Sequence, residues 1–131
     1  MKEYVERFKE NTDLKEAILK IAEENNIRSG VVLCGVGCLK EVHIRKAGAK
    51  ETFHSQGHYE IVSLMGTIAS GKVHIHISLS DEEMNTIGGH LLNGCIVDTT
   101  CELVLGILEE YELSREFDTN TGYDELVARK I

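Results

Sequence analysis

The sequence predicts an α+β fold, in which one main helix accompanies an antiparallel sheet of seven or eight strands that curls toward a barrel. Only residues 11–27 carry apolar side chains at the three- and four-residue steps of a helix. After Ser29 the chain consists of short apolar or alternating runs separated by turn residues. The 131 residues contain no internal repeat, which favours a single domain over residues 1–131.

The first elements are a short strand and the helix. VERFK, residues 5–9, is typical of a strand. In NTDLKEAILKIAEENNI, Thr12 or Asp13 can cap the helix because a short side-chain oxygen accepts a free N–H of the first turn. Asn25-Asn26 is expected to end it. The apolar stripe of this helix comprises Leu14, Ala17, Ile18, Ile21 and Ala22.

The next region predicts strands separated by a turn and a loop. GVVLCGVGCL, residues 30–39, is apolar on both faces, and Gly35 and Gly37 within it indicate a bulge or tight turn. EVHIR, residues 41–45, is predicted as a separate strand. AGAKET is expected to be a turn, FHSQGH a loop or edge, and YEIVSLMGTIA a long strand from Tyr59 to Ala69.

The second half of the chain predicts four more strands. VHIHISL is followed by the turn SDEEMN and by TIGGHLL. CIVDTTCELVLGIL follows Asn-Gly, and YELSREF alternates, with Tyr111, Leu113, Arg115 and Phe117 facing one way. The tail DTNTGYDEL is expected to be a loop, and ELVARKI a final short segment.

The charge balance disfavours unassisted binding to DNA. The chain has 22 acidic and 14 basic residues and a net charge of −8, whereas nucleic-acid binding draws on Lys and Arg that neutralise phosphates. The nearest basic cluster is thin, although a patch formed across subunits stays open. It comprises Lys40, Arg45, Lys46 and Lys50.

The N-terminal segment and the cysteines indicate the compartment. MKEYVERFKE is charged from its second residue, so neither a signal peptide nor a membrane span is expected, and the protein is predicted to be cytoplasmic. Cys34, Cys38, Cys95 and Cys101 are then expected to be free thiols. A zinc site at Cys34 and Cys38 is an alternative, but small buried side chains fit this glycine-rich stretch better.

Three histidines lie in one predicted hairpin. Alternation along a strand puts His74 and His76 on one face and the apolar residues between them on the core side. If the hairpin is centred on Glu83, His76 lies directly opposite His90, and His74 lies on the diagonal of the same face. Gly88-Gly89 lets the backbone approach closely because glycine has no Cβ.

Three converging imidazoles predict a site for Zn²⁺ or a similar divalent ion with an open fourth position. The alternative is that His74, His76 and His90 only line a polar sheet face or a subunit contact. The remaining histidines show no comparable pattern and are expected at the surface or in loops; they are His43, His54 and His58.

Several consecutive motifs together resemble one known family. The order EIVSLMGTI, VHIHISLSD, IGGHLLNGCIV, TTCELVLGIL and FDTNTGYDEL is similar to the PPC domain, the plant and prokaryote conserved domain. The upstream DLKEAILKIAEENNIRSGVVLCGVG also fits, so the resemblance covers nearly the whole chain. It implies a strongly bent antiparallel sheet flanked by a helix, and assembly as a homotrimer.

The resemblance also implies functional expectations. Prokaryotic members commonly carry a histidine trio at the positions of His74, His76 and His90, which implies a metal site, with zinc as the usual ion. Stand-alone members are often described as predicted DNA-binding proteins, a description that leans on plant members with AT-hook motifs. This chain has no R-G-R-P core, so a DNA-associated protein partner is the more natural link to DNA.

Three functions are compatible with these residues. The leading hypothesis is a regulatory, metal-carrying binding module. The alternative is a metal-dependent enzyme that activates water on a small substrate, with Glu60 or Asp81 as candidate acid/base group. The third is a purely structural role, with the histidines at a subunit boundary. A structural metal, in contrast to a catalytic one, would have its fourth position filled, for example by Cys95.

Overall fold

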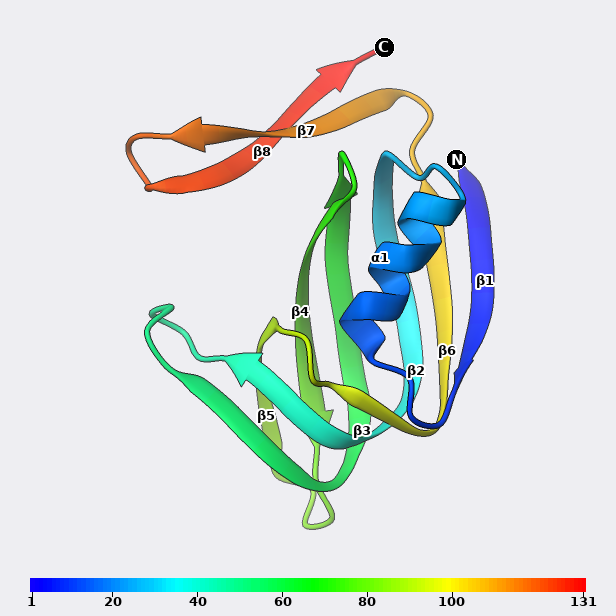
Figure 1. Cartoon of the computed structure of the whole chain (residues 1–131), viewed down its shortest axis with the longest axis vertical. Helices are drawn as coiled ribbons and strands as arrows, with labels where there is room; N and C mark the ends of the chain where they lie inside the picture. The colour runs from blue at the N-terminus through cyan, green and yellow to red at the C-terminus, as the bar shows by residue number, and fades with distance from the viewer.

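The computed structural model describes residues 1–131 and contains eight strands and one helix (Figure 1). Most of the chain is β-structure in antiparallel pairs, which broadly confirms the α+β prediction. In chain order the elements are β1 Lys2–Lys9, α1 Leu14–Glu24, β2 Ser29–Arg45, β3 Thr52–Ala69, β4 Lys72–Ser80, β5 Thr86–Leu91, β6 Ile96–Ile107, β7 Tyr111–Asp118 and β8 Tyr123–Lys130. The one helix is neither long nor apolar enough to cross a membrane.

Six strands form one sheet in the order β1-β6-β2-β3-β4-β5, and β7 and β8 form a separate hairpin. The end of β2 also pairs with β5, through Ile44 with Leu91 and Arg45 with His90. Because β2 and β3 are long and bent, the sheet turns back on itself at this point (Figure 1). β1 remains an edge strand, so the sheet is not a complete barrel.

The prediction of two separate strands for β2 was wrong, whereas one of the two alternatives for the start of β3 is correct. Residues 30–39 and 41–45 are parts of one strand, and the break expected between them is a register shift between Leu39 and Glu41. Of the two alternatives for FHSQGH, a loop or an edge, the edge is correct: it is the first part of β3, where His54 is paired with His43 and β4 does not yet pair. A bulge keeps a strand paired while bending it, so a local irregularity in the sequence does not end the element.

The C-terminal tail also differs from the prediction. Residues 118–126, expected to be a loop, contain a tight turn and the start of β8. The strand β8 pairs with β7 along its whole length, with Tyr111 opposite Lys130 at one end and Asp118 opposite Tyr123 at the other. The Asp118 carboxylate accepts a hydrogen bond from Asn120 N at 2.7 Å, and Gly122 has φ +79°. Glycine adopts this left-handed conformation without strain, so the Asn/Thr/Gly run turns the chain into a hairpin.

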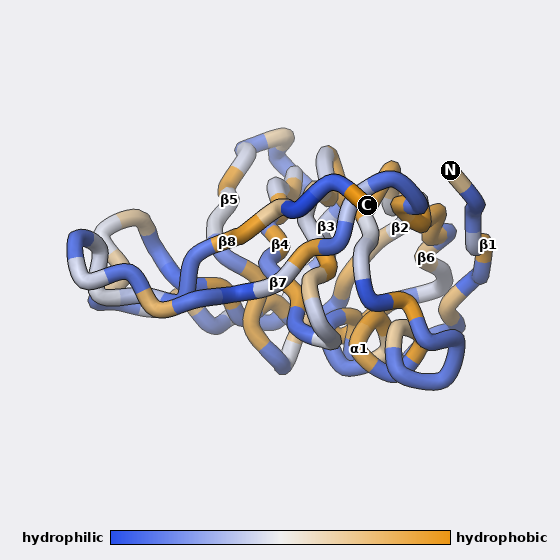
Figure 2. Tube along the Cα trace, turned by 90° about the horizontal axis from the view of Figure 1, so that it is seen from above, coloured by the Kyte–Doolittle hydropathy of each residue, from blue (hydrophilic) through white to orange (hydrophobic).

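The helix begins where its cap predicts. Asp13, and not Thr12, is the N-cap, and its carboxylate accepts a hydrogen bond from Glu16 N at 3.1 Å. The buried stripe of α1 then packs on one face of the sheet; its members are Leu14, Ile18, Ile21 and Ala22. Figure 2 shows hydrophobic stretches around α1 and the strands beside it, while the projecting tips are largely hydrophilic.

The sheet has two faces of different character. Ile75, Ile77 and Leu79 of β4 are buried in the core on the face that α1 covers, and each such side chain contributes about 1.5–3 kcal/mol on burial. The opposite face carries His74 and His76, both exposed. Exposed apolar side chains also occur on β1, β2 and β3: Val5, Leu33, Val36, Val62 and Met65.

Three hydrogen bonds attach the β7–β8 hairpin to the sheet. Ser29 Oγ accepts from Leu113 N at 2.8 Å, and Ser70 Oγ donates to Leu113 O at 3.2 Å. Arg115 Nη2 donates to Thr67 Oγ1 at 3.2 Å. Leu113 itself is buried, so the hairpin is held at this residue and reaches outward from it across the end of the sheet (Figure 1).

Candidate metal centre

The β4–β5 hairpin has the register that the sequence predicts. His76 is the direct partner of His90, and Ser80 pairs with Thr86 on either side of the turn. Asp81 fixes this turn, because its Oδ1 accepts hydrogen bonds from the backbone N–H groups of Glu83 and Asn85, both at 2.9 Å. The prediction of a hairpin centred on Glu83 is confirmed.

The three imidazoles converge on the exposed side of this hairpin. The ring centroids lie 5.0 Å apart for His74–His76, 5.3 Å for His74–His90 and 5.7 Å for His76–His90. One ligand nitrogen of each residue lies within 4.8 Å of the others. Tetrahedral zinc with Zn–N bonds of about 2.0–2.1 Å needs ligand atoms about 3.3 Å apart, so modest side-chain rotations bring the three onto one ion.

The donor set fits a divalent ion. Nδ1 of His90 is buried without a hydrogen-bond partner, and a buried polar atom that is left unpaired is costly unless a ligand satisfies it. Burial, followed by the charge of Arg45, lowers the pKa of His90 to about 4. Burial, followed by the neighbouring His76, lowers the pKa of His74. Both rings are therefore neutral near neutral pH, which is the form that binds metals.

Two glycines allow β5 to fit between its neighbours. A Cβ on Gly89 would lie 2.5 Å from the carbonyl oxygen of Arg45, and a Cβ on Gly88 would lie 2.8 Å from that of Ile77. Both separations are too short for real atoms, so only glycine permits this approach on the two sides. The expected role of Gly88-Gly89 in bringing His90 close is supported by these contacts.

Three hollows include members of the histidine group, and two of them contain His74. A cavity of about 430 Å³ is lined by His74 and His76 together with Ser63, Met65 and Ser78. A second, of about 360 Å³, includes His74 and His90 and extends under the β7–β8 hairpin. The open fourth position predicted for the metal therefore has space for a ligand.

The candidate acid/base groups do not lie in these hollows. Glu60 is exposed and pairs across the sheet with Ser80, and the Asp81 carboxylate is engaged in the turn. Neither residue lines any of the three cavities at the histidines. The structure thus gives no support to the enzymatic roles proposed for them.

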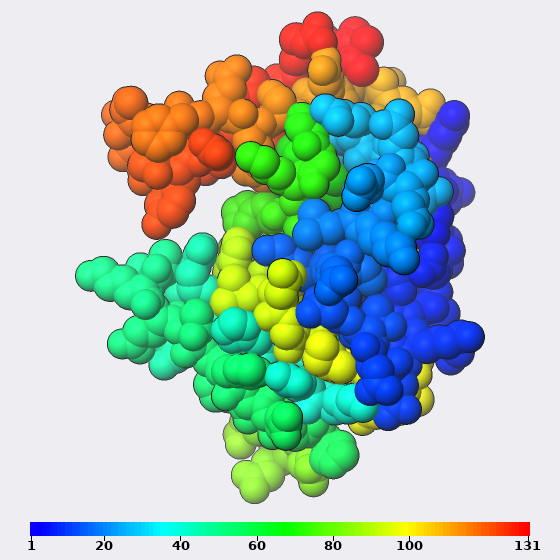
Figure 3. All heavy atoms as spheres, in the orientation of Figure 1, coloured from blue at the N-terminus to red at the C-terminus, as the bar shows by residue number.

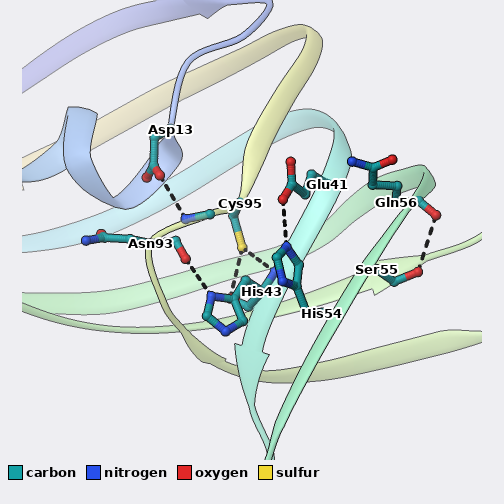
Figure 4. A network of polar contacts seen from close by, with 9 residues as sticks. Asp13, Glu41, His43, His54, Ser55, Gln56, Asn93 and Cys95 are labelled. Atoms are coloured by element: carbon teal, nitrogen blue, oxygen red, sulfur yellow. Dashed lines mark hydrogen bonds and ion pairs between the residues drawn. The ribbon is translucent and has the colours of Figure 1, made fainter.

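Cys95 is not the fourth ligand. Its Sγ donates to His43 O and accepts from His43 N, both at 3.3 Å (Figure 4). Cys95 does not belong to the group of potential metal ligands. Burial raises the pKa of this thiol to about 11, as expected for a small side chain packed in the core. All four cysteines are free, and none belongs to a cluster of metal-ligating groups, Cys34 and Cys38 included.

The other three histidines lie on strands and not in loops. His43 and His54 are partners on β2 and β3, with ring centroids 4.7 Å apart. His43 Nδ1 lies 2.8 Å from Asn93 O, and His54 Nε2 lies 2.6 Å from a Glu41 carboxylate oxygen (Figure 4). His58 is exposed on β3. These three stand apart from the metal-ligating group, as expected.

The sequence analysis did not place the charged residues that lie near the site. Arg45 is the cross-strand partner of His90, while Arg115 and Glu125 reach the same hollow from the β7–β8 hairpin. A hairpin is indicated by two alternating segments with turn residues between them: YELSREF, then TNTG, then YDELVARK. They do not reveal where it docks.

The fold and the site thus define a small, mostly β domain with three histidine side chains grouped as potential metal ligands beside an open hollow. Residues 1–109 match the Plants and Prokaryotes Conserved (PCC) domain family. The chain belongs to this family, which confirms the resemblance noted in the sequence.

Solved structures share the whole fold. A hypothetical protein from Salmonella is 32% identical, with a TM-score of 0.94 over 98% of this chain and 94% of that one. A candidate DNA-binding protein from Bacteroides thetaiotaomicron is 25% identical, with a TM-score of 0.85 over 95% and 91%. A metal-containing protein from Archaeoglobus fulgidus, at 24% identity and a TM-score of 0.81 over 97% and 94%, shows the same fold.

The curated relatives are longer proteins. The chain is 36% identical over 128 residues to a Synechococcus protein named bifunctional protein GlmU. The matched segment covers 98% of this chain and 21% of the relative. The chain therefore spans about a fifth of the length of the curated relatives that it matches.

Proposed function

We propose that this protein is a regulatory binding module that holds one divalent metal ion, zinc, through His74, His76 and His90. The observation that carries the proposal is the convergence of three ligand atoms within 4.8 Å of one another. Imidazole nitrogens suit zinc, and three protein ligands leave a fourth position for a water or ligand. The metal-containing Archaeoglobus protein of the same fold supports a metal in this architecture.

The proposed assembly is a homotrimer formed through the exposed face of the sheet. Met65, which is 67% exposed, is the cross-strand partner of His76, and it belongs to the exposed apolar set on β1, β2 and β3. A contiguous apolar surface on a globular protein is typical of an interaction site. The proposed interface therefore lies beside the metal centre, so assembly and metal binding can influence each other.

The proposed link to DNA runs through a partner. The Bacteroides relative described as a candidate DNA-binding protein supports an association with DNA. With a net charge of −8, however, this chain lacks the excess of basic groups that supplies affinity for phosphates. The Synechococcus relatives, in which the matching segment is a fifth of a longer protein, support the role of an accessory module.

The free cysteines support the proposed cytoplasmic location. Cys95 and Cys101 are buried, Cys34 is exposed, and none of the four thiols is paired in a disulfide. Unpaired thiols are typical of reducing compartments.

Elemental analysis of the purified protein, with zinc offered and unbound metal removed, tests the metal site. The wild-type protein should hold near-stoichiometric zinc, and His76→Ala and His90→Ala should each lose it. His58→Ala is the matched control, because this histidine is 73% exposed and stands outside the group. A wild-type protein that takes up no more zinc than the His90→Ala variant would overturn the proposal.

A further inference from the structure

Two arginines beside the histidines lack acidic partners. Neither Arg45 nor Arg115 forms an ion pair, whereas Arg129, on the same hairpin as Arg115, pairs with Glu112. Nε of Arg45 is buried without any hydrogen-bond partner. Acidic residues outnumber basic ones in this chain, 22 to 14, yet no carboxylate pairs with the two guanidinium groups that stand beside the histidines.

The two guanidinium groups flank the histidines from two sides. Arg45 on β2 is the cross-strand partner of His90. Arg115 donates a hydrogen bond to Thr67, the cross-strand partner of His74. Arg45 therefore lies next to His90, and Arg115 lies near His74 by way of Thr67.

Both arginines line the same hollow as the histidines. This cavity of about 360 Å³ contains Arg45, His74, His90 and Arg115, with Ala49 from the β2–β3 tip on its rim. Figure 3 shows the surface hollowed between the β7–β8 hairpin, in orange, and the β2–β3 tip, in teal. Space for a small molecule is therefore open beside the guanidinium groups.

The charges in the hollow favour an anion. Of its two acidic residues, Asp124 is engaged with Lys72 at 3.8 Å. Glu125 is the remaining carboxylate. With a divalent ion on the histidines, the positive charge of the metal and of the two arginines outweighs Glu125. Guanidinium groups present paired N–H donors in a planar fork that matches the oxygens of carboxylates and phosphates.

We infer that this hollow binds a small oxyanion, the carboxylate or phosphate group of a small molecule. One of its oxygens takes the open metal position, and Arg45 and Arg115 donate to what remains, the single second oxygen of a carboxylate or the further oxygens of a phosphate. The inference rests on the proposed metal function and names the ligand class of that site. It makes the module a sensor of a small anionic ligand, because the same metal-bound group would bridge the sheet and the β7–β8 hairpin.

The test uses the full-length protein loaded with Co²⁺, whose visible absorption reports changes in its ligands. Acetate, inorganic phosphate and chloride are titrated separately, so the carboxylate, the phosphate and a simple halide are distinguished. Arg45→Gln and Arg115→Gln should each weaken the preferred oxyanion about tenfold or more, since a charge-assisted hydrogen bond contributes about that factor. Arg115→Lys should retain part of the affinity, because it keeps the charge without the fork.

Arg7→Gln is the matched control, because Arg7 is exposed on the edge strand β1 and forms no ion pair. If Arg7→Gln and Arg115→Gln both take up cobalt and bind the oxyanion with equal affinity, the inference is overturned, while the proposed metal site is not affected. Chloride that binds as tightly as both oxyanions would also overturn the inference alone. Absence of cobalt uptake by the wild-type protein would instead overturn the proposed metal function, and the inference with it.

Discussion

His90 on β5 is the direct cross-strand partner of Arg45 on β2, at the short contact where the bent sheet meets itself. A permanent positive charge thus lies beside an imidazole that is already partly removed from water. Burial first, and the Arg45 charge second, lower the pKa of His90 to about 4. The pairing of β2 with β5 therefore also helps to keep the His90 ring uncharged.

The metal-free protein should lose stability as the pH falls from about 6.5 toward about 4. In the unfolded chain His90 takes up a proton near its ordinary pKa of about 6.5, but in the folded chain it does so only near 4. The unfolded state therefore binds more protons within this window, and acidification favours it. We expect a loss on the order of 1–2 kcal/mol, because solvent screens this half-buried group.

Urea unfolding of the wild-type protein and of His90→Gln across that pH range measures this effect. The variant should show a shallower dependence on pH, while His58→Gln, at an exposed position, should follow the wild type. Equal pH slopes for the wild type and His90→Gln would contradict the explanation.

Gly89→Ala should open the contact between β2 and β5. The new Cβ would lie 2.5 Å from the carbonyl oxygen of Arg45, so one of the two strands must move. Overpacking of this kind costs about 1–3 kcal/mol, and displacement of the adjacent His90 should weaken zinc binding as well. Thermal unfolding and zinc titration measure the two effects.

Gly71→Asn is the control for that substitution. Gly71 has φ +79°, and a Cβ added there would have no other atom within 4 Å. Asparagine tolerates the left-handed conformation better than most other side chains. This variant should keep its zinc affinity. If Gly89→Ala binds zinc as the wild type does, close packing of β5 is not what positions His90.

Met65→Glu should dissociate the proposed homotrimer. Met65 is exposed on the face proposed as the interface, where a carboxylate buried on assembly without a partner would be strongly unfavourable. Met84→Glu is the matched control, because Met84 is also exposed but lies in the β4–β5 turn. Sedimentation or light scattering should give a trimer for the wild type and the control and a smaller species for Met65→Glu. A trimer that survives in Met65→Glu would place the interface elsewhere.

The histidine register was predictable because it depends only on local order. His76 and His90 are equidistant from Glu83, and the strands on either side have clear alternation and a polar turn between them. A hairpin has one natural register under these conditions. The convergence of His74, His76 and His90 follows from that register and from the geometry of a pleated strand.

The charged residues around the histidines were not predictable in the same way. Arg45 meets His90 only because β2 and β3 bend far enough for β2 to reach β5, and the degree of a bend is not encoded in alternation. β8 is mostly exposed, so the alternation of YDELVARK is compatible with a strand but does not reveal the surface on which the hairpin docks. Arg115 and Glu125 therefore carried no local signal of their place near the metal centre.

The last prediction concerns Ser29, which anchors the hairpin that carries Arg115. Ser29 is buried, and its Oγ accepts the hydrogen bond of Leu113 N at 2.8 Å. In Ser29→Ala this buried N–H loses its partner, which costs about 1–3 kcal/mol. The loss should fall mainly on docking of the hairpin, because β7 and β8 pair with each other and not with the six-stranded sheet.

Hydrogen exchange should therefore accelerate in β7 and β8 of Ser29→Ala, with protection of α1 and β6 nearly unchanged. Ser114→Ala, at a half-buried position of β7, is the matched control and should leave exchange close to that of the wild type. The alternative, equal acceleration throughout the chain, would mean that the hairpin and the sheet unfold as one unit. In that case Ser29 would contribute to global stability and would not set the position of Arg115 over the hollow.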